Sequence, residues 1–133
     1  MLTEKDYCDK DLSLALKEAG YIGQGRCYYD LDKEPHKLRH FGIQVLTTRS
    51  AEALNFILAP KLYEAQKWLR EKHNLHITIF SQSQESWQYR ITKPHQKLED
   101  GLHGEDFASY EEALSEGVKC AVKILNEDET IHR

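Results

Sequence analysis

The chain has 133 residues, of which 40% are hydrophobic and 30% are charged, and its formal net charge is -4. This length suits one domain with a single hydrophobic core, so we expect one domain over residues 1–133. The negative balance excludes a global positive field that would attract nucleic-acid phosphates. Any contact with nucleic acid therefore needs a local basic patch.

Cysteine usage and the first residues bear on the cellular compartment. Cys8, Cys27 and Cys120 are far apart and lack Cys-x-x-Cys spacing, which argues against a disulfide framework and a thiolate zinc site. The N-terminus is acidic, unlike a secretory signal, and no apolar run approaches the roughly 20 residues that cross a bilayer. We expect a cytoplasmic protein without membrane association.

The first half of the chain predicts one helix and two strands. Apolar residues at helical spacing indicate a short helix over Asp9–Ala19. Asp9 is placed to accept a hydrogen bond from a first-turn amide, and Gly20 to end the helix in the left-handed conformation. Arg26–Leu31 and Phe41–Thr47 are strand candidates, which we expect to pair antiparallel across a polar loop.

The middle of the chain contains one ambiguous segment and the clearest helix. Ser50–Leu58 is interpreted as a short helix, although Phe56–Leu58 could also be extended. Pro60–His73 carries a narrow apolar stripe, about 60° wide, and is predicted to be a helix. Asn74 is expected to cap it in the left-handed conformation, with Leu75 folding back on the last turn.

A hairpin and a loop are predicted next. Leu75–Ser81 and Ser86–Thr92 alternate apolar and polar residues with period two, which indicates a β-hairpin. Lys93–Asp106 combines charge, two glycines and a proline with little apolar material. We therefore expect it to be a mobile loop.

The last predicted element is a helix that opens at a capping box. Ser109 and Glu112 have the spacing at which each side chain accepts a bond from the other residue's amide. The apolar face extends to Leu125, and Gly117 would let the helix lie close to a sheet. Residues 126–133 are polar and are expected to fray.

These elements predict the fold class. Helix, strands, helix, hairpin and helix together indicate an α+β domain. We expect a single antiparallel sheet of about four strands, with three main helices packed mostly on one face.

Several segments carry a resemblance to known proteins. They are A-P-K-L-Y-E-A-Q-K-W-L-R-E-K-H-N-L-H-I over Ala59–Ile77, S-Y-E-E-A-L over Ser109–Leu114, the short helix ending at Gly20, and Cys27–Tyr29. With them the chain resembles a group of small phage- and mobile-element-type bacterial proteins without an assigned activity, whereas Asp32–Phe56 departs from it. The resemblance implies a bacterial host cytoplasm and a role in modulating a host or phage protein. It carries over no catalytic residue.

Two histidines are the candidates for a metal site. His73 and His76 are separated by two residues, so a helix end followed by a strand could bring both imidazoles to one ion, with His95 or His103 as a third ligand. A histidine in the last turn of a helix also interacts favourably with the helix dipole, which is the simpler interpretation. A metal-dependent hydrolase at this site is the weakest of three function hypotheses, and we expect no cofactor.

A basic helix surface supports the second hypothesis, a small nucleic-acid-binding accessory protein. Cationic residues of the middle helix and aromatic residues of the hairpin could contact phosphates and stack on bases: Lys61, Lys67, Arg70, Lys72, His73, Trp87, Tyr89 and Arg90. Glu64 and Glu71 interrupt this charge, and alternating aromatics usually pack beneath a helix. Nucleic-acid binding is therefore disfavoured.

The leading hypothesis is a non-enzymatic accessory protein that acts through protein–protein contacts, with an unidentified partner or as a homodimer. Cys27, beside Arg26, is the one cysteine in a basic setting, but we expect it to pack as a small hydrophobe. Aromatic residues of the middle region exceed what short helices can bury and predict a contact surface: Tyr28, Tyr29, Phe41, Phe56 and Tyr63.

Overall fold

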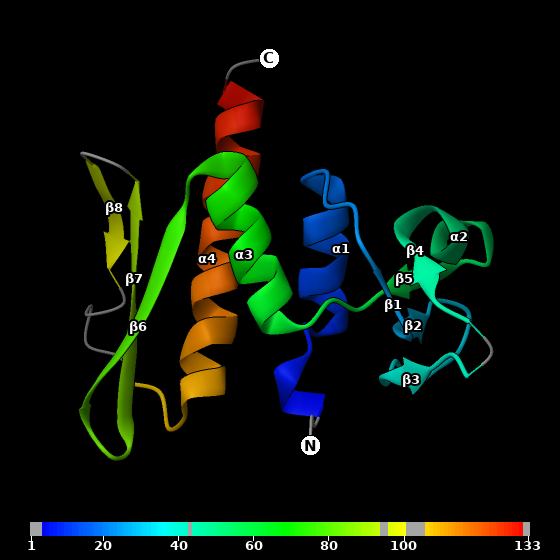
Figure 1. Ribbon diagram of the computed structural model, residues 1–133, viewed down its shortest axis with the longest axis horizontal. Helices are drawn as coiled ribbons and strands as arrows, with labels where there is room; N and C mark the ends of the chain where they lie inside the picture. The colour runs from blue at the N-terminus through cyan, green and yellow to red at the C-terminus, as the bar shows by residue number, and fades with distance from the viewer. Residues whose placement is uncertain (1–3, 43, 94–95, 101–105, 132–133) are drawn as a thin grey trace. The chain divides into compact units, whose positions relative to one another are not determined.

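The computed structural model describes residues 4–42, 44–93, 96–100 and 106–131, in two compact units, Met1–Lys61 and Leu62–Arg133 (Figure 1). Each unit combines helices with antiparallel strands, which confirms the α+β class. The prediction of a single four-stranded sheet was wrong: the described strands form three small sheets, two in the first unit and one in the second. Whether residues 1–133 fold as one domain stays a prediction, because a division by contacts does not test it.

The first unit begins with the predicted helix. A 3-10 turn, Glu4–Asp6, precedes α1, which covers Lys10–Glu18. Oδ1 of Asp9 accepts a hydrogen bond of 2.8 Å from the amide of Leu12. Gly20 has a φ of 98°, a backbone conformation that side chains disfavour, and it ends the helix as predicted.

Five short strands of the first unit form two sheets. In one sheet β2 (Cys27–Asp30) lies between β3 (Arg39–His40) and β5 (Phe56–Leu58), and in the other β1 (Gln24–Gly25) pairs with β4 (Leu46–Thr47). All three pairings are antiparallel. The predicted strand over Arg26–Leu31 is confirmed as β2.

The second strand candidate, Phe41–Thr47, was wrong. β3 ends at His40, just before this segment, and β4 covers only its last two residues. The two strands belong to different sheets. The amide of Phe41 still bonds to the carbonyl of Arg26 at 2.6 Å, whereas Leu46 pairs with Gly25. The chain must leave one sheet and join the other within this segment, so it cannot be one strand.

The ambiguous segment contains both predicted conformations. α2 covers Thr48–Ala53, and β5 follows after a turn at Asn55, whose φ is 58°. The helix begins earlier than predicted because Thr47 and Ser50 form a capping box, with amide-to-hydroxyl bonds of 3.0 and 2.8 Å. Local capping therefore decides where α2 begins.

The second unit has the longer elements. α3 covers Leu62–His73 and α4 covers Tyr110–Ile131, while β6 (His76–Ser83), β7 (Ser86–Lys93) and β8 (Gln96–Asp100) form an antiparallel sheet in that order. The predicted helices and hairpin are confirmed. Figure 1 shows α3 and α4 side by side beside the hairpin, and α4 packs against both β6 and β7.

The predicted loop over Lys93–Asp106 was wrong in part, because β8 lies within it. β8 pairs with β7, and Ile91 stands opposite Glu99. The backbone amides and carbonyls on the side of β7 away from β6 need hydrogen-bond partners, and the backbone of β8 supplies them although β8 has few apolar residues. Residues 94–95 and 101–105 of the predicted loop lie outside the described residues.

α4 begins at a modified capping box. The hydroxyl of Ser109 accepts from the amide of Glu112 at 3.2 Å, as predicted, but the Glu112 carboxylate accepts from Ala108 instead of Ser109. The helix continues to Ile131, well beyond Leu125. Fraying of residues 126–133 concerns motion and stays a prediction.

A glycine sets how closely α4 approaches the sheet. A methyl group on Gly117 would lie 2.9 Å from Cγ2 of Ile77 and 3.3 Å from the Tyr89 side chain. Only a residue without a side chain allows this approach, so the predicted role of Gly117 is confirmed. Leu69 and Val118 are fully buried in this unit.

Candidate contact surface

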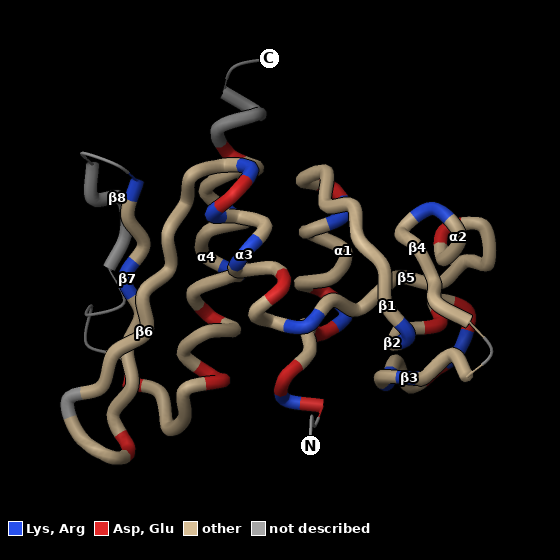
Figure 2. The backbone as a smooth tube through the Cα atoms, viewed as in Figure 1, with Lys and Arg blue, Asp and Glu red and all other residues tan. Residues whose placement is uncertain are grey.

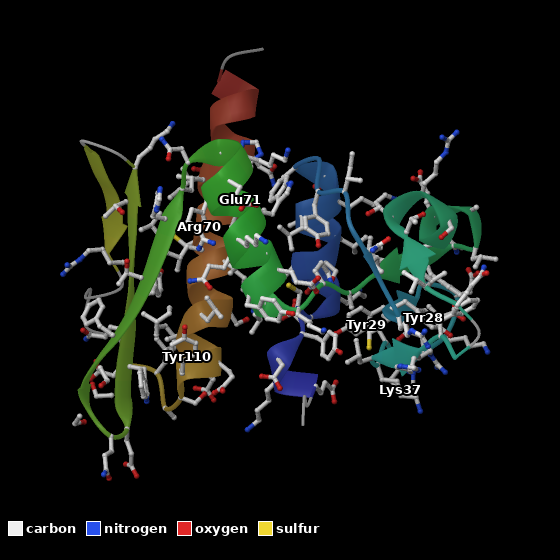
Figure 3. The ribbon with its side chains drawn as sticks, in the orientation of Figure 1. Tyr28, Tyr29, Lys37, Arg70, Glu71 and Tyr110 are labelled. Carbon is white, nitrogen blue, oxygen red and sulfur yellow. The ribbon has the colours of Figure 1, made fainter. Side chains whose placement is uncertain are left out.

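Side chains along β2 point alternately to the two faces of its sheet, and this alternation places the first residue of the candidate contact surface. Cys27 and Tyr29 point into the core of the first unit, where they pack with Ile57, and Tyr28 points to the opposite face of the sheet. In Figure 3 Tyr29 lies on the side of β2 nearer α1, and Tyr28 lies on the other side. Successive side chains of a strand point to opposite faces, so one aromatic fills the core and the next is left outside it.

Strand pairing brings further residues to the face that carries Tyr28. Tyr28 stands opposite Arg39 of β3, and Asp30 stands opposite Phe56 of β5. Because directly paired residues share a face, these side chains are neighbours on one side of the sheet. Phe41, two residues after Arg39, adds an aromatic ring next to Tyr28.

The three aromatic rings pack against one another. The centroids of Tyr28 and Phe56 are 4.2 Å apart with an interplanar angle of 20°, a stacked arrangement. Phe41 meets Tyr28 edge-on at 6.1 Å and 78°. All three residues are half-buried, and aromatic pairs of this kind contribute about 0.5–1.5 kcal/mol each beyond their buried area. We call Tyr28, Phe41 and Phe56 the aromatic face.

A turn before β5 positions Phe56. Asn55 takes the left-handed conformation, and its amide group donates to Oδ1 of Asp32 at 2.8 Å. The carbonyl of Asn55 accepts from the amide of Leu31 at 3.2 Å. Oδ1 of Asp30 in turn accepts from the amide of Asp32 at 2.9 Å. These bonds hold the chain where Phe56 reaches the Tyr28 ring.

Tyr29 is a correction to the predicted contact surface. It is only 4% exposed, and its hydroxyl donates to the carbonyl of Cys8 at 2.9 Å. Burial raises the pKa of Tyr29, and the nearby Asp9 carboxylate raises it further. The Cys8 carbonyl gives the buried hydroxyl its hydrogen-bond partner, and a buried polar group without a partner would be costly. The excess of aromatic residues in the sequence pointed to Tyr29, but it could not tell that the side chain faces the core.

Tyr63 does not join the aromatic face within one unit. It lies on α3 in the second unit and is 55% exposed. The rest of the predicted surface, the aromatic face, lies in the first unit. The predicted set of five is therefore one cluster of three, one buried tyrosine and one exposed tyrosine elsewhere.

The predicted metal ligands have other neighbours. The His73 ring packs edge-on against Trp68 at 4.8 Å, and Nε2 of His76 lies 3.1 Å from Oδ1 of Asn74. Among the residues that the structure describes, no group of three or more His, Cys, Asp or Glu could hold a metal ion. His95 and His103, the proposed third ligands, lie outside those residues.

The three cysteines differ in burial. Cys27 is 7% exposed and Cys8 is fully buried, both in the first unit, and Cys120 on α4 is half-buried. Cys27 belongs to the core cluster with Tyr29 and Ile57. The prediction that Cys27 serves as a small core hydrophobe is confirmed.

The aromatic residues of the predicted nucleic-acid surface are packed inside their unit. Trp87 meets Tyr110 of α4 edge-on at 5.7 Å, and Tyr89 lies against Gly117 of the same helix. The guanidinium of Arg90 lies over the Phe80 ring at 5.1 Å. Both aromatics therefore contact α4 and are half-buried, whereas Lys67, Arg70 and Lys72 of α3 are exposed.

Sequence reasoning missed three exposed apolar residues and one arginine of the first unit. Ile22, Val45 and Leu54 are 82%, 43% and 49% exposed. They carry no periodic pattern, so no sequence signal marks them. Arg39 was missed because the predicted strand began at Phe41, although a strand starting two residues earlier would have placed it opposite Tyr28.

Comparisons with known proteins add no relative to this description. No family model, no curated protein and no solved structure matches the chain. Within the described residues, no helix has both the length and the apolar character that crossing a membrane requires.

Proposed function

We propose that this chain is a non-enzymatic accessory protein that binds another protein through the aromatic face. The observation that carries the proposal is the stacked and edge-on arrangement of Tyr28, Phe41 and Phe56 on the side of a sheet opposite its core. Aromatic residues and arginine are enriched where protein interfaces gain most of their energy. Arg39 stands beside Tyr28 and supplies the arginine.

Charge around the aromatic face favours a protein partner over a nucleic acid. In the strand pairs of this face, Arg39 lies opposite Tyr28, and Asp30, which is only 8% exposed, lies opposite Phe56. The whole chain has a net charge of -4. A surface without excess positive charge gains little from counterion release, which drives most nucleic-acid binding.

The proposal extends to the setting implied by the sequence resemblance. We propose a bacterial cytoplasm, a phage or integrated element as the source, and a host or phage protein as the partner. This setting rests on the segments Ala59–Ile77 and Ser109–Leu114 and not on the aromatic face. The surface and the setting can therefore fail separately.

The surface is tested by alanine variants of the aromatic face. Purified wild type, Phe41→Ala and Phe56→Ala are immobilised and exposed to a lysate of phage-infected bacteria, and bound proteins are quantified. Tyr110→Ala is the matched control, because Tyr110 is a 42% exposed aromatic of the second unit. We expect a stoichiometric partner that the control retains and that the two variants bind at least about tenfold more weakly, the size of an interface hot spot.

Two results would contradict the proposed surface. One is a partner bound equally by wild type and by both alanine variants. The other is no stoichiometric partner with any bait. Circular dichroism melts of each variant show whether the sheet is intact, because Phe56→Ala removes half of the stacked pair with Tyr28.

A second function rests on the same rings. Tyr28 and Phe56 on a sheet beside Arg39 also resemble the platforms on which single-stranded nucleic acids stack. Anisotropy of a labelled single-stranded oligonucleotide at low and at physiological salt separates the two functions. Binding that weakens steeply with salt would support the nucleic-acid alternative, and we expect none.

A further inference from the structure

β6 is an edge strand of the second unit. The strand order is β6-β7-β8, so β6 pairs with β7 on one side. An edge strand leaves alternate backbone amides and carbonyls directed away from its neighbour, where another strand can bind. Which residues of β6 carry these groups follows from two independent hydrogen-bond observations.

The first observation comes from β7. The amide and carbonyl of Trp87 both bond to Phe107, at 2.9 Å each, so Trp87 faces away from β6. In an antiparallel ladder, bonding direction alternates along the strand, so Gln88 and Arg90 face β6. Their partners, Phe80 and Thr78, therefore bond inward to β7.

The second observation comes from β6 itself. Nε2 of Gln66 on α3 donates to the carbonyl of Ile77 at 2.9 Å, so this carbonyl points away from β7. By the same alternation, the amides and carbonyls of Ile79 and Ser81 point outward too. The Gln66 side chain of α3 therefore reaches this edge. Both observations assign the same outward residues.

The sequence of β6 lacks the usual protection of an edge. His76–Ser83 contains no Lys, Arg, Asp, Glu or Pro, the residues that proteins place on edges to prevent strand addition. Figure 2 shows the described part of β6 without a charged residue, in contrast to β7. An irregularity between Ser81 and Ser83 confines the regular stretch to the residues before it.

We propose that β6 pairs antiparallel with β6 of a second copy of this chain, about a two-fold axis at Ile79. Ile79 would then exchange both backbone bonds with Ile79 of the second copy. Ile77 would pair with Ser81, whose amide would replace Nε2 of Gln66 as the donor to the Ile77 carbonyl. We assign the occupant as a second copy because β6 lacks the charged and proline residues that would oppose pairing with an identical strand. Because β6 carries no charge, self-pairing opposes no like charges.

The side chains fit the same register. Thr78 would stand opposite Phe80 of the second copy on the face away from α4. Thr78 is exposed and Phe80 is half-buried beneath Arg90. The pairing would therefore cover the remaining exposed part of each Phe80 ring with a threonine methyl group. The result is one continuous antiparallel sheet shared by two copies.

The first test is the mass of the full chain in solution. Light scattering across a concentration series should show a reversible monomer–dimer equilibrium for the wild type. Thr78→Lys places two lysines diagonally opposite across the axis and should weaken the dimer at least about tenfold. Gln84→Lys adds the same charge in the exposed β6–β7 turn and should leave the dimer unchanged.

The second test reads individual amides by hydrogen exchange. The Ile79 amide should become protected as concentration rises, while the Thr78 amide, bonded to β7, should be protected throughout. Ile79→Pro removes the outward amide without removing a bond to β7 and should abolish the dimer. If that variant does not fold, Thr78→Lys still decides.

Several outcomes would overturn the assignment. They are a chain that stays monomeric at all concentrations, a dimer that Thr78→Lys leaves intact, and an Ile79 amide that exchanges at the same rate in monomer and dimer. The proposal does not depend on the aromatic face: Phe56→Ala should weaken partner binding at least about tenfold and leave the dimer unchanged.

Discussion

In both units the side chains of a strand alternate between two faces, but the aromatic residues on those faces have different surroundings in the two units. In the second unit β7 directs Trp87 and Tyr89 towards α4, which packs against them and leaves both half-buried. In the first unit β2 directs Tyr29 into the core and Tyr28 away from it. Alternation therefore separates the two faces of a strand, but the covering element decides which aromatics become buried.

The units also differ in the length of their elements. β6 and β7 have eight residues each and α4 has 22, whereas the strands of the first unit have two to four. A long element carries several periods of its own pattern, and a two-residue strand carries none. The second unit was accordingly the more predictable from sequence, and the first unit holds the candidate contact surface.

The largest expected effect tests whether the units are thermodynamically separate. Leu16 and Leu69 are fully buried, one in each unit. We expect Leu16→Ala and Leu69→Ala each to reduce the free energy of unfolding by about 2–5 kcal/mol. If residues 1–133 are one domain, calorimetry will show a single transition that both variants shift. Two transitions, each shifted by only one of the variants, would show that the two units unfold as separate domains.

A smaller effect tests the close helix contact that distinguishes the second unit. Gly117→Val would place a Cβ atom 2.9 Å from Cγ2 of Ile77, which is too close, and should destabilise the chain by about 1–3 kcal/mol. Lys123→Val is the control, because Lys123 is exposed on the same helix, and it should change stability by less than about 0.5 kcal/mol. Urea unfolding measures both. Equal effects would mean that α4 does not depend on this contact.

The smallest expected effect compares helix caps across the units. Asp9 caps α1 at 2.8 Å and Ser109 caps α4 at 3.2 Å. Replacing either by alanine should cost about 1 kcal/mol. We expect the larger loss for Asp9→Ala, because its bond is shorter and α1 has fewer residues over which to recover helix stability. A larger loss for Ser109→Ala in thermal melts would reverse this ranking.

Local signals predicted the caps and the long elements well. Asp9, Gly20 and Asn74 act at their helix ends as predicted, because capping depends on residues within one turn. The Ser109 hydroxyl behaves likewise, but the Glu112 carboxylate reaches Ala108 instead. Thus even for a local capping interaction, the donor predicted from sequence can be wrong by about one residue.

The candidate surface was predictable only as a composition. An excess of aromatic residues indicated a contact surface, and three of the five residues do cluster. The inward turn of Tyr29 depends on the Cys8 carbonyl, which is far away in sequence. The pairing of Arg39 with Tyr28 likewise depends on a strand too short to be recognised.

The sequence by itself determined the α+β class, the caps and the helical and hairpin periodicities, because these arise from interactions between near neighbours. Only the tertiary structure decided that the strands form three sheets, that β8 extends the hairpin, and which aromatic rings stay outside the core. Those choices satisfy backbone groups and bury side chains through partners distant in sequence, and no local pattern encodes such partners.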